Sequence, residues 1–163
     1  MGLLFKKRVR ADLAGWNLTA ALIDPDDCWH DICLLRSYDV PDPIATCEMA
    51  FARTAIVRDA IKATQSGEVA TLMLAAAHRL IKERFSTEDT PETFEYYSSQ
   101  RLADIGPKII QLYEKSAFPL TLLADLFASR LGVPGVAAVE ICPMFVKVGD
   151  AARKSMKRVR IVP

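Results

Sequence analysis

Residues 42–67 read DPIATCEMAFARTAIVRDAIKATQSG, and the two ends of this stretch define one long helix. Asp42 supplies a side chain suited to capping a helix N-terminus, and Pro43 follows at a position where a helix tolerates proline. Gln65, Ser66 and Gly67 together are typical of a helix end. The sequence therefore predicts a helix that runs from Asp42 to about Thr64.

Two further helices are expected before this one. Asp24-Pro25 repeats the same start signal and predicts a short helix through Trp29 and Arg36. Nearer the N-terminus, apolar residues recur every three or four positions, as they do along one face of a helix. These residues are Phe5, Val9, Leu13, Trp16, Ala20 and Ile23. We expect the first element to be an amphipathic helix that buries this stripe.

Downstream of residue 67 the pattern stays helical. Residues 68–85 have so wide an apolar arc that we expect a helix covered on more than one side. Thr90-Pro91 predicts another helix start, and Gly106-Pro107 predicts a break, beyond which Ile109 and Leu112 continue the stripe.

The last third of the chain begins with a joint at Phe118-Pro119 and a further helix that ends at Gly132. Pro143 is expected to terminate the following helical segment. Residues 144–148 and 159–162 alternate apolar with basic side chains, which suits a small C-terminal β-hairpin.

These elements predict one compact all-α domain over residues 1–163, with six or seven helical segments and the small hairpin. A 163-residue chain with 51% hydrophobic residues can bury a sizeable core. The longest uncharged stretch has eleven residues, against roughly 20 for a membrane-spanning helix, so no transmembrane helix is expected. The four cysteines are sparse, and we expect a cytoplasmic protein with unoxidised thiols.

Catalytic signatures are missing from the sequence. The seven glycines do not cluster, which excludes a P-loop or a dinucleotide fingerprint. Only two histidines are available for a hydrolytic triad, and neither lies in a recognisable nucleophile motif. Cys28, His30 and Cys33 are spaced like partial zinc ligands, but a fourth ligand is lacking and helical spacing points Cys28 away from His30. These absences lean against an enzyme without deciding the question, because catalytic residues scattered through a helical fold leave no linear trace. We expect no metal site.

Two residues could anchor a cofactor, although both have a simpler structural interpretation. His78 lies at the edge of an apolar arc, where histidines usually bond to a neighbouring helix. Cys142 precedes a proline, a pair sometimes seen where a thiolate binds haem iron and also expected at an ordinary helix end. His78 and Cys142 are the candidate anchors for haem or another apolar ligand, and no cofactor is otherwise implied.

Residues 126–133 resemble the first helix and turn of a helix-turn-helix. A recognition helix must then present Arg, Asn, Gln or Lys to the bases, whereas residues 135–142 offer mainly Val, Ala and Ile. Specific DNA reading is therefore not expected, and the latter segment is predicted to be buried.

Charge is distributed unevenly along the chain despite a formal net charge of +1. Both ends are basic, and the stretch between residues 11 and 42 is acidic. If the termini lie close together, their basic side chains would form one patch able to contact an anionic protein, lipid or nucleic-acid surface. The candidate interaction residues are Lys6, Lys7, Arg8, Arg10, Arg153, Lys154, Lys157, Arg158 and Arg160.

Three functions remain open. The leading hypothesis is a non-enzymatic domain that binds another protein, including a copy of itself, because the apolar arcs look too wide for a monomer. The second hypothesis is a carrier or sensor of an apolar ligand or haem. The third is peripheral binding of an anionic membrane or nucleic acid through the basic termini.

Overall fold

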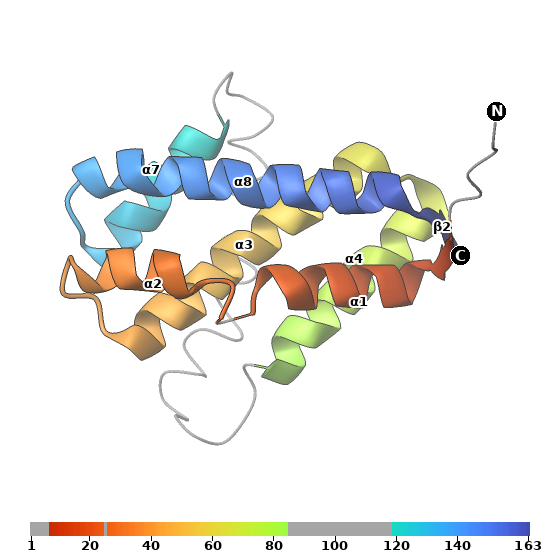
Figure 1. The fold of residues 1–163 in the computed structure, drawn as a ribbon, viewed down its shortest axis with the longest axis horizontal. Helices are drawn as coiled ribbons and strands as arrows, with labels where there is room; N and C mark the ends of the chain where they lie inside the picture. Colours follow the sequence, from red (N-terminus) through yellow and green to blue (C-terminus); the bar gives the residue numbers. More distant parts are fainter. Residues whose placement is uncertain (1–6, 25, 85–118) are drawn as a thin grey trace.

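The computed structural model describes residues 7–24, 26–84 and 119–163 (Figure 1). Within these residues six helices surround one core, and two short strands lie at one end of the molecule. The elements are β1 (Arg8–Arg10), α1 (Ala11–Leu22), α2 (Trp29–Arg36), α3 (Asp42–Thr64), α4 (Gly67–Arg84), α7 (Pro119–Leu131), α8 (Val136–Arg158) and β2 (Arg160–Val162). The all-α class predicted from the sequence is confirmed.

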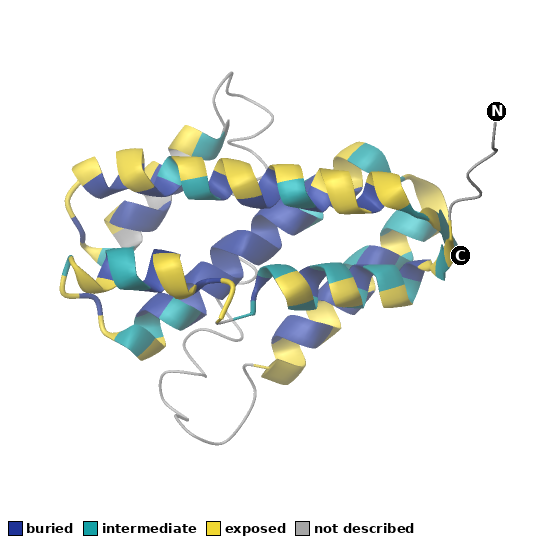
Figure 2. Ribbon diagram, in the orientation of Figure 1, coloured by how far each residue is buried: buried dark blue, intermediate teal, exposed yellow. Residues whose placement is uncertain are grey.

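Helix α3 is the centre of the fold (Figure 2). Every residue from Cys47 to Val57 is buried, and α1, α2, α4, α7 and α8 all pack against it. The predicted bounds are confirmed, but the predicted cap is wrong. Asp42 is the first helical residue, and its carboxylate accepts a hydrogen bond from Arg36 Nε at 2.9 Å instead of capping the helix.

The prediction that residues 68–85, helix α4, are covered on several sides is wrong, and the helix covered in this way is α3. Helix α4 buries one face, which consists of Met73, Ala76, Ala77, Leu80 and Ile81. The apolar residues of α3 are spread around the helix, whereas those of α4 gather on one face, so only α4 shows a clear apolar face on a helical wheel. The small alanine side chains of α3 let neighbouring helices approach it from every direction. The width of the apolar arc on a helical wheel was therefore a wrong guide to which helix is central.

The first helix differs from its prediction in both length and orientation. Helix α1 begins only at Ala11, and its buried face consists of Ala11, Gly15 and Thr19. Leu13, part of the predicted apolar stripe, is 51% exposed. A Cβ atom on Gly15 would lie 2.4 Å from the carbonyl oxygen of Met73, so α1 presses directly on the backbone of α4. Small residues allow this close approach, and the half-buried Leu18 and Leu22 also pack against buried residues that include Met73.

A buried ion pair ties three helices together where α1 ends. Arg53 of α3 bonds through Nη2 to the carboxylate of Asp31 in α2, and both side chains are less than a tenth exposed. Its Nη1 donates to the carbonyl oxygen of Leu22, in the last turn of α1, at 2.9 Å. Arg53 thus satisfies a helix-end carbonyl and fixes α1 and α2 against α3.

Helix α7 ends as the sequence predicts. Gly132 has a φ of 69°, and its amide donates to the Ser129 carbonyl, while the Val133 amide donates to the Ala128 carbonyl. This pair of bonds is a Schellman motif, in which glycine adopts the left-handed conformation at low cost. The turn sends the chain into α8, and Phe127 meets Phe145 edge-to-face with ring centroids 5.5 Å apart.

The predicted C-terminal hairpin is wrong. Residues 144–148 belong to α8, which continues through Pro143 to Arg158. Because Pro143 and Val139 are both exposed, water can satisfy the Val139 carbonyl that loses its helical donor, and the helix does not end there. Strand β2 instead pairs in parallel with β1, with Arg8 opposite Arg160 and Val9 opposite Ile161.

Three predicted features lie outside the described residues. These are the helix starting at Thr90-Pro91, the break at Gly106-Pro107, and the stripe continued by Ile109 and Leu112.

Candidate functional site

The strand pair brings the two basic ends of the chain together. Arg8 and Arg160 occupy opposing register positions of β1 and β2, and both are exposed. The amide of Arg160 donates to the Lys7 carbonyl oxygen at 3.0 Å, which extends the pairing by one residue. Side chains alternate between the faces of a strand, so Arg8 and Arg160 share one face while Val9 and Ile161 share the other.

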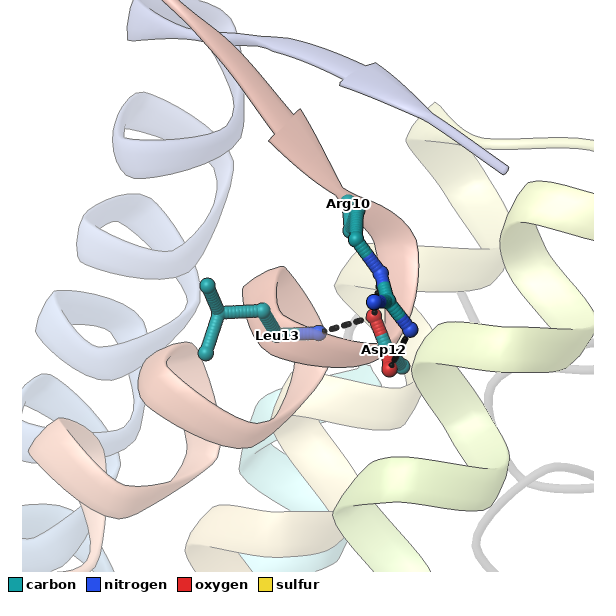
Figure 3. A network of polar contacts seen from close by, with 3 residues as sticks. All are labelled: Arg10, Asp12 and Leu13. Atoms are coloured by element: carbon teal, nitrogen blue, oxygen red, sulfur yellow. Dashed lines mark hydrogen bonds and ion pairs between the residues drawn. The ribbon is translucent and has the colours of Figure 1, made fainter.

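Two of the candidate basic residues are already engaged by carboxylates. Arg10 donates through Nε and Nη2 to Asp12, and the same carboxylate accepts a bond from the Leu13 amide at 2.8 Å (Figure 3). That backbone bond, followed by the Arg10 contact, lowers the pKa of Asp12. Arg153 pairs with Asp150 at 2.9 Å. These two arginines are therefore less available to an external anion.

The other candidate basic residues that the structure describes are exposed. Lys154 and Arg158 lie four residues apart on α8, which places them on one face of the helix, and Lys157 lies on another. Five of these residues form no ion pair with any described residue: Arg8, Lys154, Lys157, Arg158 and Arg160. Lys6 lies outside the described residues.

An apolar pocket of about 300 Å³ lies beneath the strand pair. It opens between α1 and α8, with Met73 of α4 and Met156 of α8 contributing to its wall. Among the residues that the structure describes, its polar lining residues are Asn17 and Ser155, and none of the lining residues is charged. The apolar lining includes Val9, Ala14, Leu18, Ala21, Val159 and Ile161. The inner faces of both strands thus close one end of the pocket.

The two candidate cofactor anchors lie elsewhere. His78 is exposed on α4, and Cys142 is half-buried in α8, where its Sγ lies 3.7 Å from Thr121 Oγ1. Neither residue lines the apolar pocket. An apolar ligand in this pocket would therefore be held without either predicted anchor.

The cysteine cluster at the start of α2 does not form a metal site. No group of three potential ligands converges within the part of the chain that the structure describes. Cys28 is buried beside the Leu22 carbonyl, and its loss of solvation raises the pKa of its thiol to about 11. His30 is exposed, so the three residues have different environments.

Sequence reasoning missed an exposed apolar stripe on α8. Val136, Val139 and Val146 are 61%, 72% and 39% exposed, and exposed Pro143 lies between them. The spacing of three, four and three residues places all four on one helical face, opposite buried Phe145. This spacing is visible in the sequence, but the expectation that Pro143 ends the helix hid it. The prediction that residues 135–142 are buried holds for Ala137, Ala138 and Ile141 and is wrong for Gly135, Val136, Val139 and Glu140, which are exposed.

No described helix combines the length and apolarity needed to cross a bilayer. Comparison with protein-family models, with curated proteins and with solved structures found no match for this chain. Its function must therefore be argued from the two surfaces on α8, the valine stripe and the pocket next to the basic strands.

Proposed function

We propose that this chain is a non-enzymatic helical assembly domain that self-associates through the valine stripe of α8, defined by Val136, Val139, Pro143 and Val146. The exposure of the three valines carries the proposal, because large apolar side chains spaced at three and four residues are the pattern by which one helix packs against another. A second copy presents the same stripe, so the contact is self-complementary.

Charge favours an antiparallel arrangement of the two α8 helices. Glu140 flanks the stripe in its first half, and Lys147 flanks it in its second half. Reversing one helix about Ile141 leaves Glu140 of one copy about 8 Å along the axis from Lys147 of the other, whereas a parallel arrangement sets each of these charges level with its own like. A parallel arrangement would instead bring the exposed Lys154 of each copy together, and like charges at close range are unfavourable.

The area available implies a weak dimer. Covering three partly exposed valines on each copy contributes about 1 kcal/mol per side chain, or about 6 kcal/mol in all. Association costs about 4 kcal/mol or more in lost translational and rotational freedom. The valines alone therefore leave a net of about 2 kcal/mol, which is a dissociation constant of tens of millimolar. A dimer in the millimolar range requires about 2 kcal/mol more from Pro143 and the flanking side chains, and its population should depend on concentration.

Sedimentation equilibrium from 10 µM to 1 mM, together with light scattering, tests this proposal. The Val139→Glu variant should dimerise at least about tenfold more weakly, with unchanged circular dichroism. Leu13→Glu is the matched control, because Leu13 is also exposed but lies on α1. A wild-type chain that stays monomeric throughout this range, or equal weakening by the two variants, would refute self-association through the stripe.

A charge reversal tests the orientation separately. Lys147→Glu should weaken the dimer roughly two- to fivefold, the range of an exposed ion pair, and adding Glu140→Lys should restore it. If the double variant is weaker than the single one, the helices are not antiparallel.

The proposal also assigns the protein to the cytoplasm, where thiols stay reduced. It is supported by the four cysteines, all of them within the described residues, which form no disulfide. Fractionation of cells that express the chain, with thiol labelling of the recovered protein, tests this assignment.

A further inference from the structure

The pocket beneath β1 and β2 differs from the valine stripe in both shape and surroundings. It is concave, and its lining is apolar except for Asn17 and Ser155. Its volume of about 300 Å³ lies at the lower end of the range for small-molecule sites. A cavity of about half that size accepts benzene, so this one has room for on the order of ten carbon atoms.

One exposed cation on α8 lies beside this pocket. Ser155 and Val159 line the pocket, and exposed Arg158 lies between them in the sequence, one helical turn from Ser155. Arg158 forms no ion pair with a described carboxylate, so its guanidinium can meet a ligand anion. Lys154 lies farther round α8, on the side turned away from Met156 and Val159.

The strands add a second source of positive potential. Val9 and Ile161 point into the pocket, while Arg8 and Arg160 project from the opposite face of the same two-stranded ribbon. These guanidinium groups lie on the far side of the ribbon, so they add positive potential around the pocket without touching its contents. The acidic groups nearest in sequence, Asp12 and Asp150, are already bonded to arginines.

From this juxtaposition of an apolar pocket and unpaired cations, we propose that the pocket binds a single-chain anionic amphiphile, a medium-length fatty acid. The hydrocarbon chain would lie between α1 and α8, and the carboxylate would face Arg158 at the mouth. The small apolar lining suits a linear chain, and the absence of charge inside the pocket keeps the carboxylate at the mouth.

Calorimetric titration with sodium dodecanoate, below its micelle concentration, tests the site. Acetate supplies the same head without the chain, and dodecyltrimethylammonium supplies the same chain with the opposite charge. We expect dodecanoate to bind measurably more tightly than either. Equal binding of the cationic amphiphile would refute the role of the basic residues, and equal binding of acetate would refute the role of the pocket.

Two pairs of variants locate the site. Ala21→Phe places a phenyl ring in the pocket and should weaken dodecanoate binding at least about tenfold, whereas Ala75→Phe, at an exposed alanine of α4 outside the pocket, should not. Arg158→Gln should weaken binding roughly two- to fivefold, and Lys82→Gln on α4 should have no effect. Unchanged binding in Ala21→Phe would place the ligand elsewhere and overturn the proposal.

A membrane surface is the competing partner for the same residues. Vesicles of phosphatidylglycerol distinguish the two, because a pocket for a free fatty acid binds dodecanoate in the absence of any bilayer. Binding to the vesicles without binding of monomeric dodecanoate would overturn the proposal. Val139 does not line the pocket, so the Val139→Glu variant, which should dimerise only weakly, should still bind dodecanoate. The binding test is therefore independent of self-association.

Discussion

Replacing Gly15 by alanine should destabilise the protein, although alanine is the better helix former. Gly15 lies in the middle of α1, where the intrinsic gain from Gly to Ala is about 1 kcal/mol. Against this gain, the new methyl group would lie 2.4 Å from the carbonyl oxygen and 2.6 Å from the Cα of Met73. These are backbone atoms of α4, so they cannot move aside as a flexible side chain would.

The steric cost should exceed the propensity gain. Overpacking a tight interface typically lowers the free energy of unfolding by about 1–3 kcal/mol. The new methyl group is attached to the main chain of α1 and would meet main-chain atoms of α4, so the cost at this site should be at or above the upper end of that range. The net loss should be about 2 kcal/mol in the free energy of unfolding. In a chain of this length, that corresponds to a fall of about 4–8 °C in Tm.

Gly135→Ala is the matched control. Gly135 precedes α8 with helical backbone angles, and a Cβ there meets no atom within 4 Å. This substitution should be neutral or stabilise the protein by up to about 1 kcal/mol. Urea denaturation of both variants measures the difference. A Gly15→Ala variant as stable as the wild type would refute the close approach of α1 to α4.

Three further predictions concern charged groups. Arg53→Met leaves Asp31 buried without its partner, so urea denaturation should show a free energy of unfolding lower by about 3–5 kcal/mol. Replacing Asp31 by leucine as well should recover much of that loss. Asp39 has a φ of 61° at the end of α2, so Asp39→Gly should stabilise the protein by up to about 1 kcal/mol in the same assay. The pKa of Asp12 is lowered in the folded state, so its contribution to stability is present above pH 3.8 and disappears as the pH falls through the lowered pKa. Asp12→Asn should therefore be less stable than the wild type at pH 7 and equally stable at pH 2, a contrast that denaturation at the two pH values measures.

Helix ends were predictable wherever a local signal decides them. Thr64 ends α3 just before Gln65-Ser66-Gly67, and Gly132 ends α7, because the conformations of these few residues depend mainly on their own side chains. The same local logic failed at Pro143. A proline inside a helix is tolerated when the orphaned carbonyl faces water, and that depends on which side of α8 the rest of the fold covers.

The candidate site was predictable only in its residues and not in its geometry. The basic strings at the two ends of the chain were visible in the sequence, but their parallel pairing through Arg8 and Arg160 requires the whole chain to return to its start. The pocket depends on the small residues of α1, such as Ala14 and Ala21, whose importance no hydrophobic pattern reports. The site is therefore formed by contacts between segments that are far apart in the sequence, and local sequence patterns do not reveal such contacts.

The two proposed surfaces share one rigid element and yet remain separate. The stripe is centred near Ile141, and the pocket begins at Ser155, so about 20 Å of α8 lies between them at 1.5 Å per residue. In an antiparallel dimer the two pockets would lie at opposite ends, roughly 40 Å apart, and both would open to solvent. Neither surface needs the other to be occupied, because no side chain belongs to both. Both surfaces are supported by the packing of α8 on its neighbours, α3 and α7 above all, which a substitution on either exposed face leaves unchanged.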